Sequence, residues 1–226
     1  MTVRELAGKI DHTFLKAAGE TGAVEKLCDE ARRFKFACAM VNPAEVPYAA
    51  KLLDGTGIGI GTVVGFPLGQ NTLRVKCAEA VEAVENGATD IDYVLNIRDL
   101  RSKPSQAILD DLTLMNAVVK KVNGDAVTKL IIECCYLTDD EKILACRLAK
   151  KAGFDFVKTS TGFGSGGATQ EDVALMRKTV GKSMGVKAAG GIRTLADAEK
   201  MLAAGADRLG CSAGVEILAE LYARQS

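Results

Sequence analysis

The chain has 226 residues, and its 29 Lys and Arg side chains balance its 29 Asp and Glu side chains, for a formal net charge of zero. This balance excludes the basic surface that a nucleic acid or an anionic membrane would need. No apolar stretch reaches the length of a transmembrane helix, so we expect neither class of partner.

The cellular compartment is predicted from the N-terminus and the cysteines. Residues 1–5, MTVRE, carry an acid and no hydrophobic core region, so we expect no signal peptide. Seven cysteines, an odd number without a CxxC motif, predict free thiols in a reducing cytoplasm. The only histidine is His12, to which we assign no catalytic role, and no Cys/His cluster has ligand spacing. We therefore expect a cytoplasmic protein without a metal or cofactor.

Strand-like and helix-like segments alternate along the whole chain. Glycine precedes several strands, as in Gly87-Ala88-Thr89-Asp90, and capping boxes begin helices at Thr138, Thr169 and Thr194. Between them, Cys77, Ala80, Val81 and Val84 recur with helical spacing. The predicted strands are Lys9–Thr13, Phe36–Val41, Ile58–Gly65, Asp90–Leu95, Thr128–Glu133, Phe154–Thr159, Gly185–Ala189 and Asp207–Cys211.

Eight strands separated by single helices predict parallel pairing through right-handed crossovers. At this length, the pattern fits an α/β TIM (β/α)8 barrel, one domain over residues 1–226. A doubly wound open sheet is the competing architecture, but no GxGxxG phosphate loop supports it. In a barrel, alternate strand side chains point inside and the active site forms at the carboxyl ends of the strands.

Reactive or charged side chains lie within six of these strands: Asp11, Cys38, Asp92, Lys129, Lys158 and Lys187. Such groups converging inside a barrel would make a costly core, so we expect the site there. Asp90 and Asp92 share a face; we expect Asp90 to cap or pair below, and Asp92 to act as a general acid/base. Lys129 fits equally a buried partner of Asp92 and a catalytic group.

Lys158 ends an apolar run, Phe154-Asp155-Phe156-Val157-Lys158, in which two-residue alternation places Phe154, Phe156 and Lys158 on one face. Lys187 repeats the anomaly on the next strand. Burial and a neighbouring cation both lower the pKa of an amine, and a neutral amine attacks carbonyl carbons. The pair therefore predicts imine chemistry at Lys158, with Lys187 beside it; a surface or edge lysine is the alternative for each.

Glycine-rich segments follow the last three predicted strands. Gly162, Gly164, Gly166 and Gly167 follow the sixth, Gly190-Gly191 the seventh, and Gly210-Cys211-Ser212-Ala213-Gly214 the eighth, where a helix begins. Backbone N–H groups in such turns, with a helix N-terminus behind them, bind phosphate. We expect a phosphate site there. The adjacent Cys134 and Cys135 are interpreted as small apolar residues.

From about Asp11 to Ala213, the chain resembles the deoxyribose-phosphate aldolase family. The resemblance lies in five motifs: Asp11-His12-Thr13-Phe14-Leu15-Lys16, Asp92-Tyr93-Val94, Lys129-Leu130-Ile131-Ile132-Glu133, Val157-Lys158-Thr159-Ser160-Thr161-Gly162 and Lys187-Ala188-Ala189-Gly190-Gly191-Ile192-Arg193-Thr194. It implies a class I aldolase in a TIM barrel that reversibly cleaves 2-deoxy-D-ribose 5-phosphate to acetaldehyde and D-glyceraldehyde 3-phosphate, without a cofactor. The implied partners are these small molecules.

The resemblance also implies a role for each site residue. Lys158 matches the Schiff-base lysine, Lys187 the lysine that keeps it deprotonated, and Asp92 the acid/base that works with a water. Lys129 and Asp11 match a supporting network, Cys38 a thiol near the substrate hydroxyls, and Gly162, Gly191 and Ser212 the phosphate cradle.

Two departures from the family pattern change the expectation. Ala213 replaces a second serine that some members carry, so phosphate affinity is expected to be lower or to rest more on backbone groups. Some members end in a tail with a terminal tyrosine, whereas the last tyrosine here is Tyr222. We therefore expect Asp92 and water to move the proton at the enamine carbon.

Two other functions fit parts of the pattern. One is an aldolase with a pyruvate- or dihydroxyacetone-type donor, for which Arg193 is the only nearby arginine to bind a carboxylate. The other is a non-catalytic sugar-phosphate binding barrel, which would not need two lysines and an aspartate inside. The sequence leaves open whether the protein is a homo-oligomer.

Overall fold

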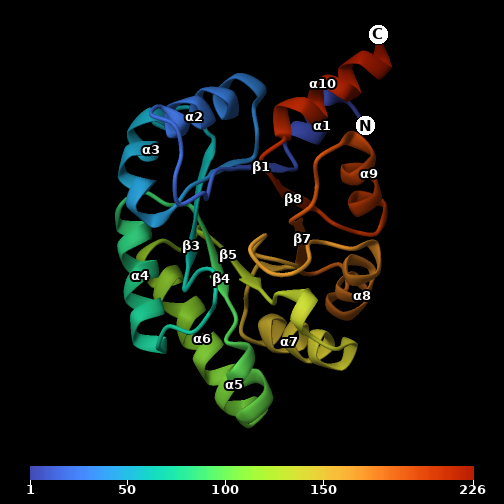
Figure 1. The fold of residues 1–226 in the computed structure, drawn as a ribbon. Coiled ribbons are helices and arrows are strands. Elements are labelled where there is room, and N and C mark those ends of the chain that lie inside the picture. Colours follow the sequence, from blue (N-terminus) through green and yellow to red (C-terminus); the bar gives the residue numbers. More distant parts are fainter.

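The eight strands form one closed, all-parallel barrel in a computed structural model that describes residues 1–226 (Figure 1). Each strand pairs with the next along the chain, and β8 closes the barrel against β1. The predicted TIM barrel is confirmed. The strands are β1 Ile10–Thr13, β2 Cys38–Met40, β3 Gly59–Val64, β4 Asp90–Val94, β5 Val127–Ile131, β6 Phe156–Lys158, β7 Gly185–Ala189 and β8 Arg208–Cys211.

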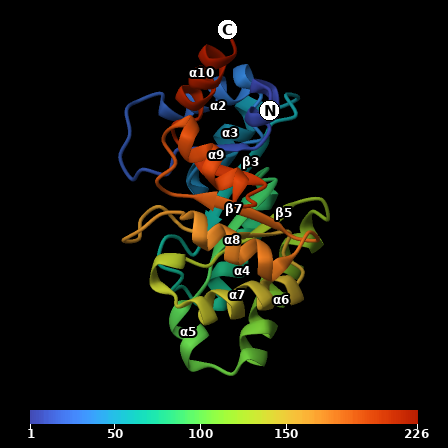
Figure 2. The same cartoon turned by 90° about the vertical axis from the view of Figure 1, so that its right-hand side faces the viewer.

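Helices surround the barrel, and the N-terminal helix α1 lies beside the C-terminal helix α10 (Figures 1 and 2). None of the helices combines the length and the apolar character needed to cross a membrane. The α-helices are α1 Val3–Ala7, α2 Ala23–Phe34, α3 Val46–Leu53, α4 Leu73–Glu85, α5 Ile97–Ser102, α6 Ser105–Val122, α7 Asp139–Lys151, α8 Gln170–Val180, α9 Leu195–Ala203 and α10 Gly214–Gln225; short 3₁₀ helices are η1 Pro43–Glu45 and η2 Cys134–Tyr136.

The helix boundaries follow the local signals in the sequence. Thr138 and Thr194 form complete capping boxes at the starts of α7 and α9, and Thr169 accepts a hydrogen bond from the Asp172 N–H at the start of α8. After α4 and α9, Gly87 and Gly205 adopt φ values of 105° and 111°, which only glycine tolerates readily. These turns deliver the chain to β4 and β8.

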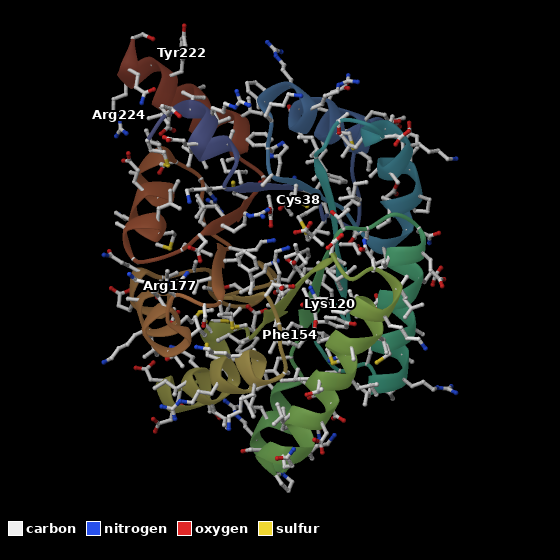
Figure 3. The ribbon with its side chains drawn as sticks, turned by 180° about the vertical axis from the view of Figure 1, so that it is seen from behind. Cys38, Lys120, Phe154, Arg177, Tyr222 and Arg224 are labelled. Atoms are coloured by element: carbon white, nitrogen blue, oxygen red, sulfur yellow. The ribbon has the colours of Figure 1, made fainter.

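The hydrophobic core lies mainly between the barrel and its helices. Tyr93 illustrates this layer, since its hydroxyl donates to the Met115 carbonyl on α6. Phe154 stacks edge-on against Tyr93, with ring centroids 5.9 Å apart (Figure 3). The predicted common face of Phe154 and Phe156 is therefore wrong. Phe154 precedes β6 and packs in the core between the barrel and the helices, whereas Phe156 lies beside the ammonium of Lys129.

Candidate active site

Lys158 and Lys187 lie side by side inside the barrel. Lys158 is the last residue of β6, Lys187 lies at the middle of β7, and their Cα atoms are direct partners in the parallel register. Both side chains are buried. Each ammonium donates to the same oxygen, Asp92 Oδ2, over 2.9 Å from Lys158 and 2.8 Å from Lys187. Asp92 projects from the middle of β4.

Further ion pairs extend the cluster through the barrel. Lys129 Nζ lies 3.3 Å from Asp92 Oδ1 and 2.5 Å from Asp90 Oδ1. Asp11 Oδ2 lies 2.6 Å from Lys187 Nζ, and Asp11 Oδ1 accepts a hydrogen bond of 2.6 Å from Arg208. Lysines 129 and 187 therefore each contact two carboxylates.

The cluster contains four cationic side chains and three carboxylates. The cations are Lys129, Lys158, Lys187 and Arg208, and the carboxylates are Asp11, Asp90 and Asp92. A buried excess charge is expensive, so loss of one proton from the cluster is favoured. Arg208 keeps its charge, because a guanidinium does not lose its proton in proteins. Among the three lysines, Lys158 has the fewest carboxylate partners, since only Asp92 contacts it within 4 Å. The geometry therefore selects Lys158 as the amine that becomes neutral.

The pKa of Lys158 is lowered to about 8. Burial is the largest cause, because an ammonium loses its hydration inside the barrel. The charge of Asp92 opposes this shift, and the charge of Lys187 adds to it. A lysine with this pKa carries a substantial neutral fraction near pH 7, which is the nucleophilic form.

Lys187, Lys129 and Asp92 stay ionised. Burial disfavours the charge on Lys187, but Asp11 and Asp92 more than offset it, and the pKa of Lys187 is raised. The pKa of Lys129 is raised for the same reason, by Asp92 and Asp90 against burial. Burial would raise the pKa of Asp92, but the three lysines hold it well below its usual range. Asp92 is therefore a carboxylate anion at neutral pH.

Cys38 is the first residue of β2, not near its carboxyl end, and its side chain is fully buried among the strands (Figure 3). Its Sγ lies 3.8 Å from Met40 Sδ. Burial, with Asp90 and Asp11 nearby, raises the pKa of the Cys38 thiol well above its usual range. Cys38 is thus a neutral thiol, and its predicted contact with substrate hydroxyls stays a prediction.

The glycine-rich segments meet at the carboxyl ends of β6, β7 and β8. The Ala168 N–H donates to the carbonyls of Ala189 and Gly190, which ties the loop after β6 to the end of β7. Gly162 and Gly191 have open space where a Cβ would stand. Ser212 is exposed, and α10 begins at Gly214 without a side-chain cap on its N–H groups. This end of the barrel combines exposed glycines with a helix N-terminus that has no side-chain cap.

The structure brings five predicted residues into one buried cluster: Asp11, Asp92, Lys129, Lys158 and Lys187. The three predicted phosphate-site residues lie apart from it, on exposed loops: Gly162, Gly191 and Ser212. Asp90 pairs with Lys129, as expected of a partner below Asp92. No group of three or more His, Cys, Asp or Glu side chains is placed to hold a metal ion. Tyr222 lies on α10 with 68% of its surface exposed (Figure 3).

Two residues of the site had no role in the sequence analysis. Arg208 pairs with Asp11, and its signal was a charged residue within a predicted strand. Glu133 is buried just after β5 with φ of 55°, a left-handed conformation that is uncommon outside glycine. Its carboxylate accepts hydrogen bonds from the N–H and the hydroxyl of Thr161, so it anchors the loop that follows Lys158.

Comparison with known proteins places this site in a family. Residues 6–220 match the DeoC/LacD family of aldolases. The chain is 54% identical to a deoxyribose-phosphate aldolase of Carboxydothermus hydrogenoformans, over 95% of this chain and 94% of the relative. It is 53% identical to a deoxyribose-phosphate aldolase of Bacillus subtilis, over 94% of each chain.

A solved structure shows the same fold. The tetrameric deoxyribose phosphate aldolase of Aeropyrum pernix superimposes with a TM-score of 0.91 at 33% identity, covering 99% of this chain and 93% of that one. The resemblance seen in the sequence is thus confirmed. The chain belongs to the DeoC/LacD family of aldolases, and it is accordingly a lyase.

Proposed function

We propose that the protein reversibly cleaves 2-deoxy-D-ribose 5-phosphate to acetaldehyde and D-glyceraldehyde 3-phosphate through a Schiff base on Lys158. The observation that carries this proposal is the buried amine of Lys158, whose pKa is lowered. It lies 2.9 Å from the ionised Asp92 and beside the charged Lys187 on the neighbouring strand. The names of the two bacterial relatives supply the substrate.

The chemistry proceeds from the neutral amine. Lys158 Nζ attacks the C1 aldehyde of the open-chain sugar, and the carbinolamine takes up a proton and loses water to give an iminium. The iminium withdraws the electron pair of the C2–C3 bond as the C3 hydroxyl loses its proton, which releases glyceraldehyde 3-phosphate. The enamine left on Lys158 is protonated at carbon, and water then releases acetaldehyde and the free amine.

Asp92 is the proton carrier in this proposal, through a water molecule. Its Oδ2 lies within hydrogen-bond distance of Lys158 Nζ, and its depressed pKa leaves it ionised to accept the proton. Positioned acid–base groups of this kind typically contribute about 10²–10⁴-fold to a rate. Lys187 keeps its charge and favours the neutral form of Lys158.

The remaining residues position the catalytic side chains or bind the substrate. Lys129 holds Asp92 in place, and Asp11 holds Lys187 in place, each through an ion pair. The neutral thiol of Cys38 lines the site near the substrate hydroxyls. The 5-phosphate binds at the exposed carboxyl end, to backbone N–H groups around Gly162, Gly191 and Ser212 and to the N-terminus of α10.

A donor with its own carboxylate finds less support. Arg193, the arginine considered for this role, is exposed on the loop after β7. Arg208, inside the barrel, already pairs with Asp11.

We also propose a cytoplasmic location and a homo-oligomer. All seven cysteines are free, as expected in a reducing compartment. The Aeropyrum pernix relative is a tetramer. Sedimentation of the purified protein tests the second point.

Borohydride trapping tests the proposed function. The protein is incubated with acetaldehyde and reduced, and the ethylated residue is located by peptide mapping. We expect an adduct on Lys158 and release of acetaldehyde from 2-deoxy-D-ribose 5-phosphate. Lys158→Arg keeps the charge but has no amine that can be deprotonated, so both results should disappear. An adduct on Lys187 or Lys129 in place of Lys158 would overturn the assignment.

A further inference from the structure

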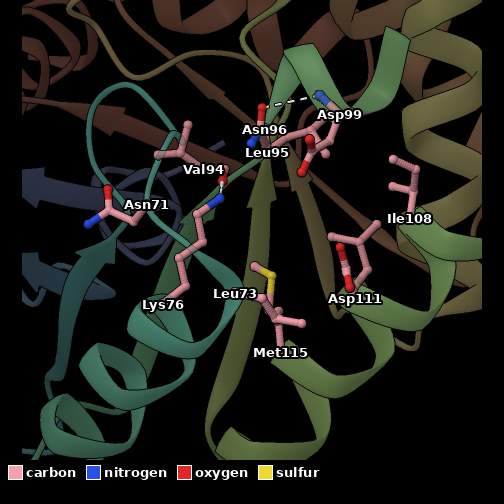
Figure 4. A pocket seen from close by; sticks show the side chains of 11 residues that line it. Asn71, Leu73, Lys76, Val94, Leu95, Asn96, Asp99, Ile108, Asp111 and Met115 are labelled. Atoms are coloured by element: carbon pink, nitrogen blue, oxygen red, sulfur yellow. Dashed lines mark hydrogen bonds between the residues drawn. The ribbon is translucent and has the colours of Figure 1, made fainter. Parts of the chain in front are cut away.

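A fourth buried lysine lies outside the barrel, on helix α4. Lys76 has only 3% of its surface exposed. No carboxylate oxygen lies within 4.0 Å of its ammonium nitrogen, so it forms no ion pair. The three buried lysines of the active site all have such partners. Lys76 Nζ makes one hydrogen bond, of 2.8 Å to the Val94 carbonyl at the end of β4 (Figure 4). A buried amine with so little compensation is costly unless it is used or neutral.

The Lys76 amine faces a small cavity that is partly open to solvent (Figure 4). The cavity lies between α4, α6 and the segment that joins β4 to α5, and none of its lining residues belongs to the active site. Six of its 11 lining residues are hydrophobic. The stem of Lys76 is held in place against Gly65, where an added Cβ would lie 2.7 Å from Lys76 Cε. The amine is thus fixed at the wall of a small cavity of mixed apolar and polar lining.

The walls favour a neutral ligand over an anion. Asp99 and Asp111 line the same cavity, and both are paired with Lys103, at 3.0 and 3.4 Å. These carboxylates repel an anion that approaches Lys76. A small aldehyde has no charge to repel, has an apolar body that suits the cavity, and has an electrophilic carbon that a neutral amine attacks.

The Lys76 amine is neutral often enough to react. Burial lowers the pKa of Lys76 to about 8, against the opposing charges of Asp99, Glu79, Asp111 and Cys77. About one tenth of such an amine is neutral at pH 7, against about one part in 2,500 for a lysine with the ordinary pKa of about 10.4. Its reactivity should therefore resemble that of the active-site lysine.

We propose that Lys76 is a second imine-forming lysine, a covalent site for small aldehydes in the cavity between α4 and α6. The choice of acetaldehyde as the aldehyde rests on the proposed function, which releases it. The amine nitrogen adds to the aldehyde carbon, and the carbinolamine takes up one proton from solvent and loses water to give an iminium, which keeps one N–H for the Val94 carbonyl. The iminium keeps the positive charge that Asp99 and Asp111 favour. Water reverses the reaction.

The test uses the Lys158→Arg variant, in which the proposed catalytic amine is absent. This protein is treated with dilute acetaldehyde and cyanoborohydride at pH 7, and the rate of ethylation at each lysine is followed by peptide mapping. Lys26, whose side chain is 77% exposed, serves as the internal reference. We expect Lys76 to be ethylated about two-hundredfold faster than Lys26, from the ratio of the two neutral fractions given above. Equal rates at the two lysines would overturn the proposal.

A variant at the opening of the cavity tests whether aldehydes reach Lys76 through it. Asn71 lines the cavity and is exposed, so Asn71→Trp covers the opening without changing the core. Ethylation of Lys76 should slow by about tenfold, whereas that of Lys26 should not change; tenfold corresponds to about 1.4 kcal/mol. An unchanged rate at Lys76 would show that aldehydes do not react there through this cavity. In the native chain, failure to label Lys158 would contradict the proposed function alone and would leave Lys76 in place.

Discussion

Lys158 and Lys187, direct partners on neighbouring parallel strands, donate to one and the same carboxylate oxygen of Asp92. The two lysines differ in what else they contact. Lys187 also pairs with Asp11 at 2.6 Å, whereas Lys158 has Asp92 alone. This asymmetry assigns the lost proton to Lys158 and the retained charge to Lys187.

Replacing Lys187 with leucine should raise the pKa of Lys158. Burial remains the largest cause of the low pKa of Lys158, but the repelling charge of Lys187 is gone. Asp92 then no longer shares its carboxylate oxygen with Lys187, so it stabilises the charged form of Lys158 more strongly. Two charges a few ångströms apart interact by roughly 1–4 kcal/mol in a partly solvated site, or about one to three pKa units. Because the neutral amine then forms only at higher pH, the acidic limb of the pH–rate profile should move upward.

Lys129→Leu is the matched control for this experiment. Lys129 is another buried lysine of the cluster, but it contacts Asp92 through the oxygen farther from Lys158. Its removal should move the acidic limb less. If Lys187→Leu leaves the limb where it is in the wild type, the role of Lys187 lies in proton transfer or substrate contact instead.

Asp92→Asn should cost both activity and stability. The amide cannot accept the proton, so kcat should fall by about 10²–10⁴-fold. It also leaves three buried lysines without their shared anion, which should lower the free energy of unfolding by about 3–5 kcal/mol. Asp90→Asn, which affects only Lys129, should lose far less activity. Similar losses of activity in both variants would contradict a special role for Asp92.

The stability difference should itself depend on pH. The folded-state pKa of Asp92 is depressed, so its contribution to stability is complete above the unfolded pKa of about 3.9 and is lost as the pH falls through the folded value. Urea unfolding of wild type and Asp92→Asn should therefore differ most near pH 7. The two curves should begin to converge below about pH 4 and should meet only below the folded-state pKa of Asp92.

The sequence predicts the barrel and the lysine pair because those signals are local. Lys158 and Lys187 each interrupt an apolar strand, and capping threonines mark three of the helices. The partners of these lysines are not local. Asp11 joins the cluster only because β8 closes on β1, which also brings in Arg208, 197 positions away.

Lys76 was missed for a different reason. The apolar spacing of Cys77, Ala80, Val81 and Val84 predicts the helix correctly, but Cys77 and Val81 are only partly buried, whereas Lys76 is buried. A lysine next to an apolar stripe is ordinarily solvated, and only the packing of α4 against α6 shows that this one is not.

Thr161→Val should loosen the loop that follows Lys158. The Thr161 hydroxyl donates to the buried carboxylate of Glu133, and valine leaves that oxygen without a partner. An unsatisfied buried acceptor costs about 1–3 kcal/mol, which the urea midpoint would report. The KM for the phosphorylated sugar should rise as well, because Gly162 is the next residue. Thr113→Val, on the exposed surface of α6, should change stability by no more than about 0.5 kcal/mol.

Ser212→Asp should raise the KM for 2-deoxy-D-ribose 5-phosphate far more than the KM for plain deoxyribose. The new carboxylate would lie just before α10, whose first N–H groups have no side-chain cap, and it would both repel the phosphate and compete for those donors. Ser183→Asp is the matched control, because it adds the same charge to an exposed serine just before β7, at the opposite end of the strands. That variant should leave both KM values unchanged. Equal increases for the two sugars in Ser212→Asp would mean that the phosphate binds elsewhere.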